Sequence, residues 1–146
     1  MKFTKLSWCS GLVLFALGSV PYVEAQQDTT PPVLAGFDFS PKQVDATASD
    51  AAITFTGHVT YNLSGELSGW TVLATSPTAQ QKVATSMNLV SGTGLDGTYQ
   101  GMLILPAHSE AGTWTINQIH LFDAAGNSSF YSANDLQLLG SPAPSW

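Results

Sequence analysis

The stretch from Gly112 to Asn127, GTWTINQIHLFDAAGN, constrains the fold of this chain more than any other part, because it has the pattern of a long core strand followed by a tight turn. Most of its residues are β-branched, aromatic or otherwise suited to a pleated surface. In the turn, Gly126 can take a positive φ and the Asp123 side chain can bond back to the backbone. The stretch therefore predicts a strand that turns directly into an antiparallel partner.

The apolar residues of this strand do not keep a single alternation. Trp114 and Ile116 share one parity, whereas Ile119 and Leu121 share the other. Since alternate residues of a strand point to opposite faces, a regular strand would bury only one of these pairs. A β-bulge near residues 117–118 is therefore predicted, because one extra residue brings all four side chains to the same face.

Residues 1–25 have the pattern of a secretory signal peptide. A basic start, with Lys2 and Lys5, precedes the apolar run 12–20, and Val23-Glu24-Ala25 offers a small-residue cleavage site. The apolar run is shorter than the ~20 residues that a membrane-spanning helix needs, so a cleaved signal is favoured over a membrane anchor. We expect a bacterial protein that is secreted to the periplasm, the cell surface or the medium.

Cleavage after residue 25 leaves enough chain for one domain over residues 26–140, followed by a Ser/Pro tail at 141–146. Cys9 leaves with the signal, so the stability of the mature chain must come from a packed core and hydrogen-bonded strands. The mature chain holds nine acidic residues, two lysines and no arginine, a formal net charge of −7. Such a surface repels nucleic acid and anionic lipid, and neither is an expected partner.

Short apolar runs separated by Gly, Pro and Ser predict further strands along the mature chain. In the first of them, Val33, Ala35, Phe37 and Phe39 are expected to point inward. Ser132 with Asp135 predicts a capped helical turn that ends at Gly140, and a strand in this segment is the alternative. The strands are expected at residues 33–39, 53–61, 70–75, 82–90, 99–105, 114–122 and 129–131, with a short edge segment at 44–46; the inward aromatic residues Phe55, Trp70, Tyr99 and Trp114 are expected in the core and not on a carbohydrate platform.

Several motifs of the mature chain, taken in their order, resemble the repeats of bacterial immunoglobulin-like surface modules. They are DTTPPVL at 28–34, DGTY at 96–99, LILP at 103–106, EAGTWT at 110–115 and DAAGN at 123–127. The resemblance implies an all-β, immunoglobulin-like antiparallel β-sandwich of about seven strands that serves as a spacer, adhesion unit or accessory domain. The chain differs where related repeats often carry acids, at Tyr61-Asn62, and where they often add a strand, after Gly140.

No catalytic motif is visible. His58, His108 and His120 lack metal-ligand spacing, and no serine lies in a Gly-x-Ser-x-Gly turn. The preferred interpretation is therefore a non-catalytic binding or structural module with an unidentified protein or glycan partner. The alternative is a small secreted enzyme or inhibitor with a site built from loops, which a cluster of the three histidines would favour.

Calcium is the metal that the loops are best suited to hold, because clustered carboxylate and amide oxygens suit a hard cation. The candidate ligands are Asp28, Asp123 and Asn127, and Asp96 is a much weaker fourth candidate. A calcium-dependent adhesion module is thus a further alternative. The competing interpretation, which we prefer, is that Asp123 and Asn127 only shape their turn.

The C-terminal region leads to a prediction about partners. The prolines after Gly140 do not suit a central strand, so the last strand of related modules is expected to be missing or shortened. An edge strand left unpaired invites strand addition, by a second copy or by another protein. The alternative is that the helical turn near residues 136–139 covers this edge.

Overall fold

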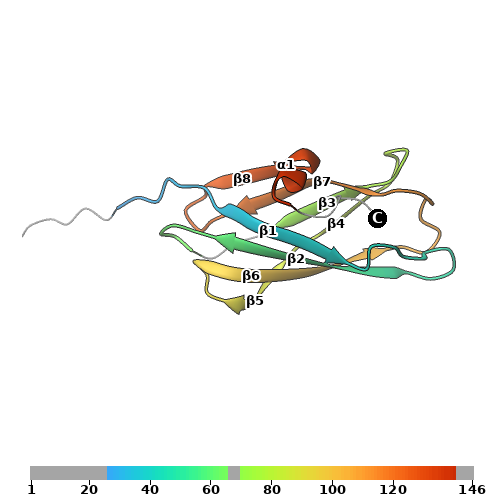
Figure 1. The fold of residues 1–146 in the computed structure, drawn as a ribbon, viewed down its shortest axis with the longest axis horizontal. Coiled ribbons are helices and arrows are strands. Elements are labelled where there is room, and N and C mark those ends of the chain that lie inside the picture. The colour runs from blue at the N-terminus through green and yellow to red at the C-terminus, as the bar shows by residue number, and fades with distance from the viewer. Residues whose placement is uncertain (1–25, 66–69, 141–146) are drawn as a thin grey trace, which may run out of the picture.

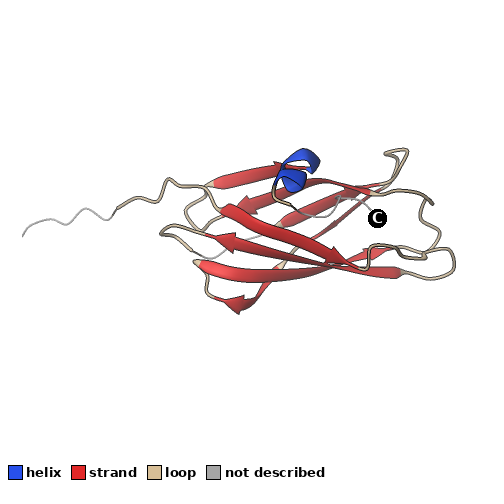
Figure 2. Cartoon of the chain, in the orientation of Figure 1, coloured by secondary structure: helices blue, strands red, loops and turns tan. Residues whose placement is uncertain are grey.

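The computed structural model describes residues 26–65 and 70–140, which form two antiparallel β-sheets packed face to face (Figures 1 and 2). The predicted signal peptide and the Ser/Pro tail lie outside the described residues. The elements of the described part are β1 (Val33–Ser40), β2 (Ala51–Thr60), β3 (Thr71–Thr75), β4 (Lys82–Thr85), β5 (Asn88–Gly92), β6 (Asp96–Leu105), β7 (Thr115–Phe122), β8 (Ser128–Ser132) and α1 (Ala133–Leu138).

The two sheets have the strand orders β1-β2-β6-β5 and β4-β3-β7-β8, and every pairing is antiparallel. The predicted all-β sandwich is confirmed, with eight strands in the described residues where about seven were expected. The difference arises at residues 82–90, which do not form a single strand. The chain leaves one sheet after β4 and joins the other at β5, and the Ser86 backbone passes so close to Gly101 that a Cβ there would lie 2.3 Å from the Ser86 carbonyl oxygen.

The predicted bulge lies in β7, at Asn117. Leu73 of β3 faces Gln118 and Ala74 faces Ile116, so Asn117 is the extra residue between them. Its side-chain amide donates a hydrogen bond to the hydroxyl of Thr75. All four apolar side chains on the two sides of the bulge are buried, as predicted: Trp114, Ile116, Ile119 and Leu121.

The prediction of which side chains point inward was wrong for the first half of β1. Val33 is 51% exposed, whereas Leu34 is 1% exposed, and only Phe37 and Phe39 point inward as expected. The register of β1 against β2 shifts between Leu34 and Gly36, which leaves Ala35 as the extra residue. A second bulge thus changes the parity of the strand. Residues 44–46 were also predicted as a strand and form none.

The core between the sheets contains the aromatic residues that the sequence placed there. Phe55, Trp70, Tyr99 and Trp114 are all buried. The Trp70 ring lies 5.2 Å from that of Tyr99, measured between centroids. It also covers the backbone of Gly57 so closely that a Cβ on this glycine would lie 2.4 Å from a ring carbon. A side chain at this position of β2 would therefore displace Trp70.

Helix α1 is the last described element, and it has the predicted N-terminal cap. The Ser132 hydroxyl accepts a hydrogen bond from the Asp135 backbone N–H, and the Asp135 side chain accepts one from the Ser132 backbone N–H. Leu136 is fully buried in the core, and Gly140 has a φ of +72° just after the helix. The helix packs against β7 and β8. The described residues contain no helix that is long and apolar enough to cross a bilayer.

The close contact between Gly57 and Trp70 yields a stability prediction with a matched control. Gly57→Ala should lower the free energy of unfolding by about 1–3 kcal/mol, because the added methyl group overpacks the core. Gly36→Ala, on the neighbouring strand, meets nothing within 4 Å. We expect it to be neutral or to stabilise by up to about 1 kcal/mol. Urea unfolding of both variants measures this, and equal losses would contradict the packing described.

Candidate functional site

Hydrogen bonds link the three candidate calcium ligands at the end of the sandwich where the chain enters β1. Asn127, in the β7–β8 turn, donates from its side-chain amide to the Asp123 carboxylate at 2.7 Å. The same amide donates to the backbone carbonyl of Asp28 at 3.2 Å. The amide thus joins the N-terminal segment to the turn.

The Asp28 carboxylate is occupied by backbone donors. One oxygen accepts from the N–H of Thr30 at 3.0 Å, and the other accepts from the N–H groups of Ser64 at 2.7 Å and Leu63 at 3.3 Å. Hydrogen bonds from Ser64, and then from Thr30 and Leu63, lower the pKa of Asp28 to about 2. Because the residue is only 8% exposed, these donors replace water around the charge.

The Asp123 carboxylate also accepts hydrogen bonds, here from groups within its own turn. The residue is 2% exposed, and its second carboxylate oxygen accepts from the Asn127 backbone N–H at 2.8 Å. The Asp123 N–H donates to the Asn127 carbonyl, and Gly126 takes a φ of +90° to close the turn. The Ala124 N–H also donates to the Gly65 carbonyl at 3.3 Å, which links the turn to the β2–β3 loop.

We call the set Asp28, Ser64, Asp123 and Asn127 the loop brace, because it ties three segments distant in sequence. Each carboxylate accepts from N–H donors, whereas a calcium ion requires those oxygens to converge on it. In the described part of the chain, no three His, Cys, Asp or Glu side chains are grouped to hold a metal. The geometry is that of a structural brace, and calcium binding stays a prediction.

The three histidines lie in different parts of the fold and have different neighbours. His58, on β2, contacts the Asp96 carboxylate at 2.6 Å, so the fourth calcium candidate belongs to a surface pair. His108 lies in the β6–β7 corner, where its backbone N–H donates to the Ala46 carbonyl. His120 lies on the outer face of β7. They do not form the cluster that would favour a catalytic site.

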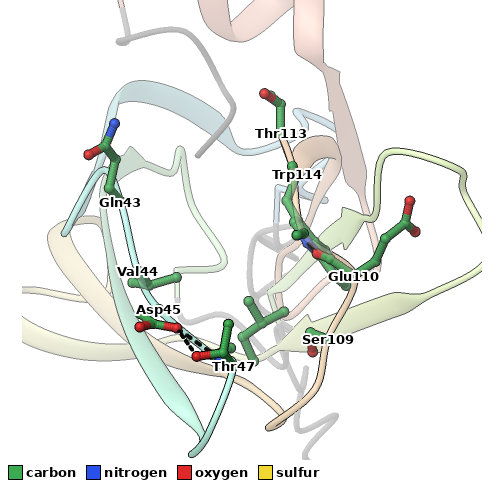
Figure 3. Close-up of a pocket in the computed structure, with 12 residues that line it drawn as sticks. Gln43, Val44, Asp45, Thr47, Ser109, Glu110, Thr113 and Trp114 are labelled. Carbon is green, nitrogen blue, oxygen red and sulfur yellow. Dashed lines mark hydrogen bonds between the residues drawn. The ribbon is translucent and has the colours of Figure 1, made fainter.

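A groove of about 440 Å³ opens beyond the C-terminal end of β1, away from the loop brace. One wall is the β1–β2 connection with Asp45 and Thr47, and the other is the β6–β7 corner with Glu110, Thr113 and Trp114 (Figure 3). The sequence motifs did not indicate this groove. The sequence feature that could have indicated the groove is the segment AHSEAG, residues 107–112, which forms the corner before the central strand.

The two carboxylates of the groove are held in their ionised form. The Thr47 hydroxyl and N–H, at 2.6 and 2.9 Å, lower the pKa of Asp45. Hydrogen bonds from Ser76 and Thr78 lower the pKa of Glu110. A general acid requires a carboxyl group whose pKa lies near the working pH, and neither group has this property. The groove therefore offers no acid–base pair from these two residues.

An aromatic cluster on the outer face of the β3-β7-β8 sheet was not found from the sequence. The His120 ring lies 3.6 Å from that of Phe130 and 3.7 Å from that of Phe122, measured between centroids. Phe130 is 60% exposed. Burial between its neighbours lowers the pKa of His120, which keeps the ring neutral at physiological pH. Strand parity could have revealed the cluster, since 120 and 122 alternate with the buried 119 and 121.

The loop brace predicts a defined dependence of stability on pH. Asp28 has a pKa of about 2 in the folded chain against an ordinary value of 3.8. The stability it contributes is present above 3.8 and is lost as the pH falls toward 2. Asp28→Asn should therefore lower the melting temperature at neutral pH and make its fall between these pH values shallower. Melting curves measured from pH 7 to pH 2 that run parallel for both proteins would contradict this role.

Comparison with curated proteins and with solved structures finds no match. A family model described as a domain of unknown function, DUF7743, matches residues 26–141, which include both sheets, the loop brace and the groove. Because the match extends over more than half of the chain, the protein belongs to the DUF7743 family.

Proposed function

We propose that this protein is an exported, non-catalytic binding module with an immunoglobulin-like sandwich, used at the bacterial cell surface for adhesion or as an accessory domain. Two features support export. The N-terminal 25 residues have the pattern of a signal peptide, and the family match begins at residue 26, where that segment ends. The absence of cysteine from the mature chain is compatible with bacterial export.

The strand order supports the immunoglobulin-like part of the proposal. The sheet β1-β2-β6-β5 corresponds to the A-B-E-D sheet of an immunoglobulin constant domain, and β3-β7-β8 corresponds to its C-F-G sheet. Strand β4 is then an added strand beside β3. In this correspondence, the loop brace joins the loop after β2 to the turn after β7, which lie at the same end of the sandwich.

The observation that carries the binding function is the aromatic cluster of Phe122, His120 and Phe130 on the outer face of the sheet, in which Phe130 is exposed. Apolar surface that is rimmed by polar residues marks interaction sites in soluble proteins. Phe130 projects from the edge strand β8 with 60% of its surface exposed, although burial in the core would have stabilised the fold. A binding role gives a reason for keeping this ring outside.

The loop ends support binding over catalysis. At one end the carboxylates of Asp28 and Asp123 accept hydrogen bonds within the loop brace. At the other end Asp45 and Glu110 have lowered pKa values and accept from neighbouring threonines. These carboxylates stabilise loops, so the described loops supply neither a poised acid nor an activated nucleophile from them.

The proposal predicts that the mature protein binds to envelopes of the source organism through Phe130. A fluorescent chain of residues 26–146 should be retained on washed envelopes, and Phe130→Ser should lose this retention. Met102→Ser is the matched control, because Met102 is also 60% exposed but lies on β6 of the other sheet. Circular dichroism establishes that both variants are folded. Retention that is absent in all three proteins, or equal in all three, would contradict the proposal.

A further inference from the structure

The register of the β3-β7-β8 sheet aligns the outward side chains around Phe130 in rows. Thr71, His120 and Phe130 face one another across the three strands and form the first row. Gln118 lies in the next row, between Leu73 and Ser132. On the other side of the first row, Phe122 faces Ser128. The outer face thus carries one aromatic cluster surrounded by hydroxyl and amide groups.

These rows carry no charge, in a chain whose formal net charge is −6. Their one titratable side chain is His120, and burial lowers its pKa, so that it is neutral at physiological pH. Two carboxylates border these rows: Asp123, after β7, is buried in the loop brace, and Asp135 accepts hydrogen bonds from the hydroxyl and N–H of Ser132. An anionic ligand would find no cationic side chain in these rows, which points to a neutral occupant.

The aromatic cluster leaves one flat face available. His120 lies between the other two rings, and its plane is inclined by only 21° to the ring of Phe130. Phe130 is therefore the end of a stack, on the edge strand β8. The face of Phe130 turned away from His120 can receive a flat apolar surface. The C–H face of a pyranose ring is such a surface, whereas its rim of hydroxyl groups is polar.

Hydrogen-bonding groups stand next to the stack. The Gln118 amide and the Thr71 hydroxyl make no hydrogen bond with any described residue; Thr71 lies in the row of His120, and Gln118 lies in the next row. An amide offers donors and an acceptor, and a hydroxyl offers both roles. Binding sites typically combine an apolar surface with a few polar groups that orient the ligand. A sugar ring offers an apolar face for the aromatic ring and hydroxyl groups for the amide and the hydroxyl.

We propose that this face is a subsite for a neutral glycan, with one pyranose ring stacked on Phe130 and its hydroxyl groups bound by Gln118 and Thr71. The inference rests on the proposed binding function and adds the ligand class. A protein partner is less well suited. Stable protein interfaces bury about 800 Å² on each side around arginine, tyrosine or tryptophan anchors, whereas this cluster comprises three rings on two strands with no arginine in the chain.

The test uses the mature chain and defined sugars. Neutral hexasaccharides of glucose, mannose and N-acetylglucosamine are titrated in calorimetry and in amide NMR, with a polygalacturonate oligomer as the charged comparison. At least one neutral sugar should bind and shift the resonances of Thr71, Gln118 and Phe130. Its affinity should fall by about tenfold or more in Phe130→Ser and in Gln118→Ala, and should be kept in Phe130→Trp and in the control Met102→Ser.

Four outcomes would overturn the ligand assignment. The first is that no neutral sugar binds, and the second is that Phe130→Ser binds as well as the wild type. The third is that envelope retention depends on Phe130 but disappears after protease treatment of the envelopes and survives periodate oxidation of their sugars. In that third case the proposed binding function holds, and the partner is a protein. Concentration-dependent association in sedimentation that Phe130→Ser abolishes would instead identify a second copy as the occupant.

Discussion

The bulge at Asn117 is the constraint on which the rest of the sandwich depends. Strand β7 lies inside its sheet, between β3 and β8, and contributes buried side chains from both of its halves. Without an extra residue, either Trp114 and Ile116 or Ile119 and Leu121 would face water. Exposing two large apolar side chains would cost several kcal/mol, a large part of the stability of a domain of this size. The bulge therefore determines which residues form the core.

The same bulge determines the outer face. Because Ile119 and Leu121 point inward, His120 and Phe122 must point outward, where His120 meets Phe130 of β8. The loop brace then holds the β7–β8 turn against the N-terminal segment and the β2–β3 loop. Rigid strands and a braced turn fix the position of Phe130 relative to Gln118 and Thr71. The proposed binding face is thus a consequence of how the core is packed.

Alternation and turn chemistry predicted much of this structure, and failed where a tertiary constraint acted. The bulge in β7 was visible because four large apolar residues required it, whereas the bulge at Ala35 was not, because Val33 and Leu34 are equally apolar. The division of residues 82–90 between two sheets depends on packing around Gly101, which no local pattern records. Asp28, Asp123 and Asn127 were candidates for a shared calcium site, but most donors to the two carboxylates are backbone N–H groups, which all sequences share and no motif records.

Two single-residue deletions in β7 test the role of the bulge most directly. Removing Asn117 converts β7 into a regular strand in which Ile116, Ile119 and Leu121 alternate inward, so the protein should still unfold cooperatively and keep Trp114 buried, as tryptophan fluorescence reports. Removing His120 leaves Ile119 and Leu121 adjacent, so one of them must face water, and the cooperative transition should be lost. If both deletions unfolded the protein equally, or if the deletion of His120 were tolerated, the account given for β7 would be wrong.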